Sequence, residues 1–298
     1  MAQGEWTRRD FFRRSAFVGV AAVGAPVVLA ACQSTGSSGD TLTAAKSANT
    51  IRVGIANEQP YGFADSSGNT TGEAPEVARA AFKALGIANV QASVVPFDQL
   101  IPALNAKQFD VVAAGMNITP TRCKAALFSD PDYSALTALL VPKGNPQGVS
   151  TLADVASKKV NLAVLSGAVE KGYATSAGVS DSQITTLDTQ DNMLRAVTAG
   201  RVYAAALTDI SLKWLVKQNP DAGVEVTPGF TPTQSGKAVV SAGGFVFRQS
   251  DTSLRDAFNQ QLQTLHGNGQ WLQIVTPFGF GQNNLPPAGL TTATLCAG

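Results

Sequence analysis

An arginine placed directly after a helix-start signal could bind an anion. Thr119 and Pro120 are residue types that begin helices, threonine as the N-cap and proline in the first helical position. The free N–H groups at a helix start carry positive partial charge, and Arg122 adds a planar fork that matches a carboxylate. The segment therefore predicts an anion clamp, while a surface ion pair is the alternative for Arg122.

Acidic and aromatic side chains follow the first two expected strands and could bind a cation. Glu58 and Tyr61 come after a strand at 51–56, and Phe97 comes after a strand at 90–95. A delocalised cation is bound by a carboxylate that accepts its N–H groups and by aromatic faces, each cation–π contact contributing about 0.5–2 kcal/mol. The pattern predicts such a pocket, although both rings could instead belong to the core.

Polar segments also end two strands in the second half of the chain. Ser166-Gly167-Ala168 follows a strand at 160–165 and could offer backbone N–H groups to the same anion. Thr208-Asp209 follows a strand at 203–207. Asp209 could accept an ammonium group, or it could serve only the start of the next helix.

Composition and missing motifs argue against enzymes, metal sites and nucleic-acid binding. Lys and Arg number 22 against 21 Asp and Glu, so there is no basic surplus for nucleic acid. His266 is the only histidine, and neither a G-x-S-x-G elbow nor a phosphate-binding loop is present. We expect no catalytic residues, no metal and no cofactor. The alternatives are acid–base catalysis through Glu58 or Asp209 and a structural or adhesive lipoprotein.

The strand and helix patterns alternate twice along the chain, which indicates two parallel sheets covered by helices. Ligands of such sheets bind at the carboxyl ends of the strands. The stretches at 142–146 and 239–244 predict two crossings between lobes. The expected lobes are residues 51–141 with 244–298 for lobe 1, and 142–243 for lobe 2. The expected elements are strands at 51–56, 90–95, 110–114, 160–165 and 203–207, and helices at 75–85, 98–106, from 120, from 169, 191–199, 210–217 and 251–265.

The first 32 residues are typical of an export signal. Thr7-Arg8-Arg9-Asp10-Phe11-Phe12-Arg13 is a twin-arginine pattern, and the uncharged run at 16–31 is shorter than the ~20 residues of a spanning helix. Leu29-Ala30-Ala31-Cys32 is typical of a lipobox, which predicts acylation of Cys32; an intact anchoring helix is the alternative. Residues 33–50 predict a flexible tether. We expect a monomer that is lipid-anchored at the outer face of the cytoplasmic membrane.

Two cysteines remain if Cys32 carries lipid. Cys123 and Cys296 form an even pair in an exported chain, which favours a disulfide. Two separate buried thiols are the alternative, because spacing alone does not establish proximity.

Several motifs carry a family resemblance over residues 51–298. The chain resembles the amino-acid-type (family 3) solute-binding proteins of ABC importers, and most of all the ectoine/hydroxyectoine-binding proteins. The general resemblance is carried by Asn57-Glu58-Gln59-Pro60-Tyr61-Gly62-Phe63, Gly72-Glu73-Ala74-Pro75-Glu76-Val77-Ala78 and Ala114-Gly115-Met116-Asn117-Ile118-Thr119-Pro120-Thr121-Arg122. The resemblance to the ectoine/hydroxyectoine-binding proteins is carried by Gly72–Glu76, Cys123-Lys124, Gly167-Ala168-Val169-Glu170-Lys171-Gly172-Tyr173, Phe278-Gly279-Phe280 and Asn284-Leu285-Pro286.

The resemblance implies a bilobed α/β type II periplasmic-binding-protein fold with a two-segment hinge. It implies that Arg122 and the Gly167 backbone hold a ligand carboxylate, and that Glu58, Tyr61 and Phe97 surround a cation. The protein would deliver a small zwitterion, ectoine or hydroxyectoine, to the permease subunits of an ABC importer. The implied ligand-binding residues are Glu58, Tyr61, Phe97, Gly115, Asn117, Thr119, Arg122, Gly167, Ala168 and Asp209.

The sequence departs from both patterns. Ectoine binders place an aromatic ring where this chain has Asn117, which predicts weaker ectoine binding or a preference for another zwitterion. Ala168 lacks the hydroxyl that amino-acid binders often have, whereas Asp209 matches their ammonium acceptor. A polar amino-acid-binding protein is therefore the alternative, and an exported dehydratase-like enzyme on the same fold is a remote one.

Overall fold

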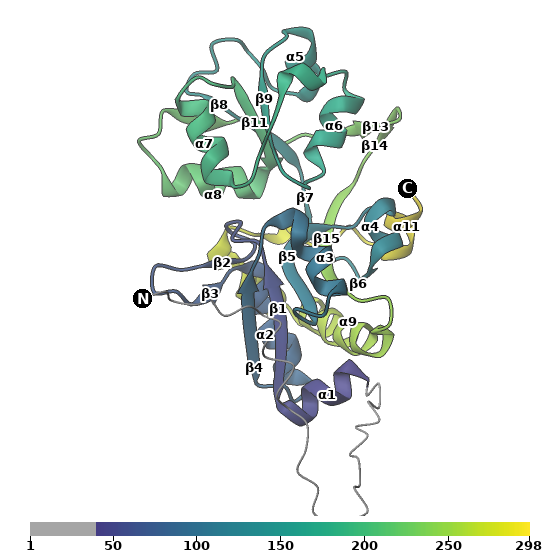
Figure 1. Ribbon diagram of the computed structural model, residues 1–298. Helices are drawn as coiled ribbons and strands as arrows, with labels where there is room; N and C mark the ends of the chain where they lie inside the picture. Colours follow the sequence, from purple (N-terminus) through teal and green to yellow (C-terminus); the bar gives the residue numbers. More distant parts are fainter. Residues whose placement is uncertain (1–39) are drawn as a thin grey trace, which may run out of the picture. The chain divides into compact units, whose positions relative to one another are not determined.

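The computed structural model describes residues 40–298, and their main strands form two separate sheets, one in each of two lobes (Figure 1). The twin-arginine signal, Cys32 and the beginning of the expected tether lie outside the described residues.

The lobe 1 sheet has six strands in the order β4-β1-β5-β15-β6, with β7 also paired to β15. β1 is parallel to β4 and β5, whereas β15 is antiparallel to β5, β6 and β7. Almost every residue of β5 and β15 is buried, because helices cover both faces of the sheet. The strands are β1 (Thr50–Ile55), β4 (Asn89–Val94), β5 (Val111–Asn117), β6 (Leu127–Phe128), β7 (Tyr133–Ala135) and β15 (Ser241–Phe247).

The lobe 2 sheet has five strands in the order β10-β9-β11-β8-β12. β10, β9 and β11 are parallel, and β8 runs antiparallel between β11 and β12. Short hairpins pair β2 with β3 and β13 with β14. These strands are β2 (Phe63–Ala64), β3 (Thr70–Thr71), β8 (Thr137–Pro142), β9 (Leu162–Leu165), β10 (Ile184–Leu187), β11 (Ala204–Thr208), β12 (Val224–Val226), β13 (Thr233–Gln234) and β14 (Lys237–Ala238).

Helices begin at threonines in several places. Thr119, Thr151, Thr189 and Thr208 each accept a hydrogen bond from a backbone N–H of the first turn, which satisfies a donor that the helix itself leaves free. The α-helices are α1 (Thr41–Ala48), α2 (Glu73–Ala84), α3 (Leu100–Asn105), α4 (Pro120–Ala125), α5 (Leu152–Ser157), α6 (Glu170–Ser176), α7 (Gln190–Thr198), α8 (Asp209–Gln218), α9 (Thr252–Gly267), α10 (Gln270–Val275) and α11 (Thr292–Ala297). The 3-10 turns among residues 40–298 are η2 (Phe97–Gln99), η3 (Asp181–Gln183), η4 (Thr276–Phe278) and η5 (Gln282–Asn284).

Figure 1 shows one lobe above the other, and the chain passes between them at β7 and β15. The first crossing is at Leu136, between β7 of one sheet and β8 of the other, and the return is at 239–240, before β15. The expected crossing at Pro142 is wrong, because the apolar run at 137–141 is a strand of lobe 2 that pairs with β11. The Pro- and Gly-rich stretch after it is a turn inside that lobe. Gly244 likewise lies within β15 and not at the lobe boundary.

Residues 41–48 correct the expected tether. They form helix α1, in which Ala45 is buried and Thr41 donates a hydrogen bond to Asp251 (2.9 Å, Oγ1 to Oδ1). Small residues allow this helix to pack closely on lobe 1. Any tether therefore ends by Asp40.

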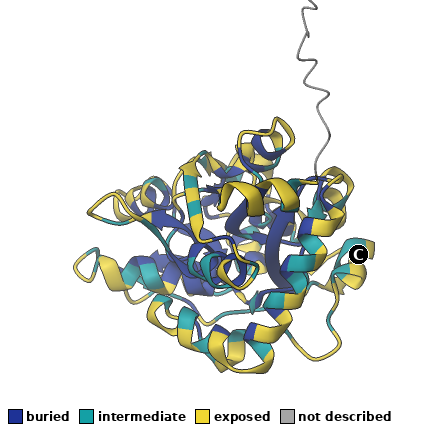
Figure 2. Ribbon diagram, turned by 90° about the horizontal axis from the view of Figure 1, so that it is seen from below, coloured by how far each residue is buried: buried dark blue, intermediate teal, exposed yellow. Residues whose placement is uncertain are grey.

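The core consists of the two sheets and the inner faces of their helices, drawn dark blue in Figure 2. In lobe 1, Phe82, Phe258 and Trp271 are fully buried, and rings of Phe82, Phe245 and Phe247 contact Phe258. Aromatic burial of this extent gives lobe 1 a firm base for the residues at its sheet edge.

Candidate functional site

A small cavity lies between the two lobes, at the carboxyl ends of the parallel strands. Lobe 1 contributes residues that follow β1, β4 and β5, and lobe 2 contributes residues that follow β9 or end β11. The lining residues are Glu58, Tyr61, Phe97, Gly115, Asn117, Arg122, Ala168, Val169, Glu170, Leu207 and Thr208.

Arg122 joins the lobes through backbone carbonyl groups. Its Nη1 donates to Asn117 O and its Nη2 to Gly167 O, both at 2.8 Å. The guanidinium carbon lies 5.4 Å from the centroid of the Phe97 ring, which is a cation–π contact. Burial lowers the pKa of Arg122, and the charges of Glu170 and Glu58 oppose that shift. Arg122 is thus a half-buried cation that these two hydrogen bonds hold in a fixed orientation at the cavity wall.

Glu58 faces the cavity from lobe 1. Ser211, at the start of α8 in lobe 2, donates its hydroxyl to Glu58 Oε1 at 2.8 Å. Burial raises the pKa of Glu58 to about 7, while the hydrogen bond and Arg122 oppose the shift. The carboxyl group therefore changes charge in the physiological range unless a bound cation stabilises its ionised form.

Tyr61 forms the floor of the cavity. Its hydroxyl donates to Thr208 Oγ1 of lobe 2 at 3.0 Å, and its ring centroid lies 5.0 Å from that of Tyr133 and 5.6 Å from that of Phe280. Gly115 has a φ of +59°, and a Cβ atom there would lie 2.2 Å from Tyr61 Cδ1. Only glycine lets the ring and β5 approach this closely.

Glu170 is a cavity residue that sequence reasoning did not select. It begins α6 directly after β9, is 3% exposed, and faces the cavity with Val169 and Ala168. Burial raises its pKa to about 7, and the charge of Glu58 adds to the shift. Glu170 follows a parallel strand, and residues at that edge of a sheet commonly contact ligands, so its place in the sequence could have identified it as a candidate.

The structure brings together most of the ten expected ligand residues. Glu58, Tyr61, Phe97, Gly115, Asn117, Arg122 and Ala168 line the cavity; Thr119 caps α4, and Gly167 contacts Arg122. The group that Gly167 turns toward Arg122 is its carbonyl oxygen, not the N–H that we expected to meet a carboxylate.

Asp209 does not line the cavity. Its carboxylate accepts the backbone N–H of Leu136 at 3.1 Å and pairs with Lys213 at 2.5 Å. It therefore ties α8 to the first crossing between the lobes. Leu207, Thr208 and Val169 line the cavity in the second lobe instead.

Asn117 stands at the end of β5, where the ectoine-binder resemblance implied a ring. Its Nδ2 donates to Ser241 Oγ at 2.6 Å, and the residue is 6% exposed. The amide is therefore held by the first residue of β15, next to the return crossing.

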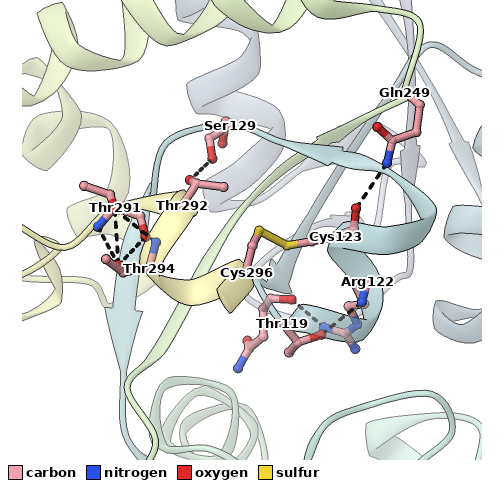
Figure 3. Close-up of a disulfide and its surroundings, with 10 residues drawn as sticks. Thr119, Arg122, Cys123, Ser129, Gln249, Thr291, Thr292, Thr294 and Cys296 are labelled. Atoms are coloured by element: carbon pink, nitrogen blue, oxygen red, sulfur yellow. Dashed lines mark hydrogen bonds between the residues drawn. A yellow bond between two sulfur atoms is a disulfide. The ribbon is translucent and has the colours of Figure 1, made fainter. Parts of the chain in front are cut away.

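Cys123 and Cys296 form a disulfide in the structure, with their Cα atoms 5.7 Å apart (Figure 3). The bond fastens α11, near the chain's end, to α4, the helix that carries Arg122. Thr292 of α11 also donates to Ser129 O at 2.5 Å. The C-terminal segment therefore braces the arginine helix.

Within residues 40–298, no three His, Cys, Asp or Glu side chains gather closely enough to hold a metal ion. The same part of the chain has no helix with the length and apolar character needed to cross a membrane.

Residues 51–282 match the bacterial extracellular solute-binding proteins, family 3. A probable amino-acid ABC transporter periplasmic-binding protein of Sinorhizobium fredii is 33% identical over 260 residues, covering 86% of each chain. An arginine-binding extracellular protein of Bacillus subtilis is 29% identical over 220 residues, covering 72% of this chain and 80% of that one.

Solved structures agree with these matches. EhuB in complex with hydroxyectoine aligns with a TM-score of 0.78 and 32% identity, covering 86% of this chain and 98% of that one. An ancestral amino acid-binding protein, a precursor of cyclohexadienyl dehydratase, aligns with a TM-score of 0.70 and 27% identity, covering 80% and 99%. The fold is therefore the bilobed periplasmic-binding-protein fold, and the chain belongs to family 3 of the bacterial extracellular solute-binding proteins, as a solute-binding protein of an amino-acid-type ABC transporter.

Proposed function

We propose that this protein captures a small zwitterion, ectoine or hydroxyectoine, in the cavity between its lobes. The observation that carries the proposal is the opposition of charges in one small cavity, where Arg122 and Glu58 both face inward beside the rings of Phe97 and Tyr61. A cyclic amidinium carboxylate needs a guanidinium for its carboxylate, and a carboxylate with aromatic faces for its cation.

The same residues explain how binding couples to closure. Glu58, Tyr61 and Arg122 each hydrogen-bond a partner in lobe 2, so a ligand that contacts both walls adds to contacts that only the closed form makes. A ligand with higher affinity for the closed form shifts the population toward it. The closed form would be the one that permease subunits recognise.

The similarity to EhuB in complex with hydroxyectoine supports this choice of ligand. A second candidate is a polar or cationic amino acid. The arginine-binding relative supports it, and the additional carboxylate of Glu170 in the cavity favours it.

We infer further that the protein is exported through its twin-arginine signal and is lipid-anchored as a monomer through Cys32. Labelled fatty acid should be incorporated into the wild-type protein and not into Cys32→Ala, which should instead leave the membrane fraction. Equal labelling of both proteins would contradict the anchor.

Calorimetric titration of residues 33–298 tests the ligand. We expect ectoine or hydroxyectoine to bind with micromolar or lower Kd, and glutamine and arginine to bind more weakly. Clear heat with arginine and none with either ectoine would replace the first candidate by the second.

A further inference from the structure

Each lobe presents one buried carboxyl group to the cavity. Glu58 comes from lobe 1 and is 9% exposed, and Glu170 comes from lobe 2 and is 3% exposed. Both are held in place by the elements that carry them, since Glu58 follows β1 and Glu170 begins α6. Closure of the lobes therefore brings two acidic groups to one small space.

The two groups differ in their partners. Glu58 accepts the Ser211 hydroxyl, whereas the carboxyl group of Glu170 makes no hydrogen bond or ion pair with another residue among those described, 40–298. Nη1 and Nη2 of Arg122 each donate a hydrogen bond to a backbone carbonyl oxygen. The carboxyl group of Glu170 therefore has only its own backbone N–H as a hydrogen-bond donor, and an almost fully buried residue of this kind that lines a cavity leaves acceptor positions for a ligand.

Closure without a ligand is costly for these groups. Burial disfavours the ionised form of each and raises the pKa of each carboxyl group to about 7, and the charge of Glu58 adds to the shift of Glu170. The other titratable groups that face Glu170 are Arg122 and Tyr173, and Arg122 compensates only in part. A cation between the two carboxylates would remove the repulsion.

We propose that Glu170 is a second ligand-binding carboxylate, and that the lobes close when a ligand cation with N–H donors on two sides bridges Glu58 and Glu170. The proposal rests on the proposed function and narrows its ligand to an amidinium, a guanidinium or a primary ammonium that also carries a carboxylate. A quaternary ammonium such as glycine betaine has no N–H to donate and would not bridge the carboxylates.

Titration at pH 8 with ectoine, arginine and glycine betaine tests the bridge in wild type, Glu170→Gln and Glu170→Ala. Asp191→Asn is the matched control, because Asp191 is an exposed acid in the first turn of another lobe 2 helix. Loss of a hydrogen bond to a charged group should weaken the binding of ectoine or arginine by about 10–100-fold in both Glu170 variants. The control should match wild type, and glycine betaine should bind none of the proteins. Wild-type affinity in Glu170→Gln, or tight betaine binding, would overturn the bridge.

A ligand-free measurement separates failure of the bridge from failure of the proposed function. Small-angle scattering should show wild-type lobes more open at pH 8 than at pH 5.5, because protonation favours the closed form, whose carboxyl pKa values are raised. Glu170→Gln should show a smaller change.

If wild type binds arginine and not ectoine, the first ligand is wrong and arginine becomes the probe for Glu170. If none of the three binds, the proposed function fails and scattering alone decides; equal scattering of both proteins at both pH values would overturn the bridge.

Discussion

The two walls of the cavity are built differently. The lobe 1 wall contains a cluster of aromatic rings, since Tyr61 contacts Tyr133 and Phe280 in tilted and edge-to-face arrangements and Phe97 lies against Arg122. The lobe 2 wall consists mostly of small or aliphatic residues, with Thr208 and Glu170 as its polar members. Lobe 1 thus presents a cation, an acid and aromatic rings to the cavity, and lobe 2 adds one acid.

The contacts across the cavity fit this division. Single hydrogen bonds join the walls, and each contributes only about 0.5–1.5 kcal/mol because water can replace its partner. Opening of the lobes exchanges these bonds for bonds to water, so a ligand that contacts both walls shifts the balance toward the closed form. These bonds are Tyr61–Thr208, Ser211–Glu58, Ser211–Gln59, Arg122–Gly167, Ser166–Asp98 and Trp214–Gln59.

The largest effect is expected from Arg122→Ala, which removes the only cation among the residues that line the cavity. The ligand carboxylate would lose its charged partner, so affinity should fall by more than about 100-fold. Arg122→Lys is the control and should recover only part of the loss, because an ammonium lacks the planar fork. Calorimetric titration measures both, and unchanged affinity in Arg122→Ala would contradict the clamp.

Loss of the disulfide should lower the stability of lobe 1 and leave that of lobe 2 unchanged, because both cysteines belong to lobe 1. Its two cysteines are 173 residues apart, and removal of a disulfide that closes a long loop costs about 2–5 kcal/mol. The double variant Cys123→Ser with Cys296→Ser should show a lower melting temperature. Reductant should lower the melting temperature of wild type and leave that of the variant unchanged. Mass spectrometry of unreduced, exported protein should find the two cysteines linked; free thiols there would refute the bond.

A buried acid beneath the lobe 1 wall predicts a pH-dependent stability. Glu73 is fully buried, and burial with the charge of Asp132 raises its pKa well above 4.5. The folded protein therefore keeps a proton that the unfolded chain releases, so the free energy of unfolding falls as pH rises above about 4.5. Glu73→Gln should be more stable than wild type at pH 8 and equal to it near pH 4. Urea unfolding at both pH values measures this, and a less stable variant at pH 8 would contradict it.

The smallest effect is expected from Tyr61→Phe. The ring at position 61 keeps its contact with Tyr133, and only the hydrogen bond to Thr208 is lost. The affinity for the ligand should therefore fall by about 2–10-fold. Thr208→Val removes the other partner, and the double variant should be no weaker than the worse single one. Additive losses in this cycle would show that the two side chains act separately.

Much of the fold and part of the site could be predicted from sequence because their signals are local. Thr119-Pro120 has the residue types preferred at a helix start, and the alternation of apolar strands with amphipathic helices indicates a layered α/β fold. A side chain that follows a parallel strand lies at the ligand edge, which is how Glu58, Tyr61 and Phe97 were selected. Each of these inferences needs only neighbouring residues.

The tertiary structure alone decided what depends on distant parts of the chain. In the tertiary structure Arg122 donates a hydrogen bond to the carbonyl of Gly167, and Asp209 accepts one from Leu136 at the first crossing. Glu170 lines the same cavity as Glu58. The tertiary structure also put the apolar run at 137–141 into the lobe 2 sheet and packed 41–48 on lobe 1. An apolar run or a lone acid is compatible with several locations in sequence, and only packing against the other lobe selects one of them.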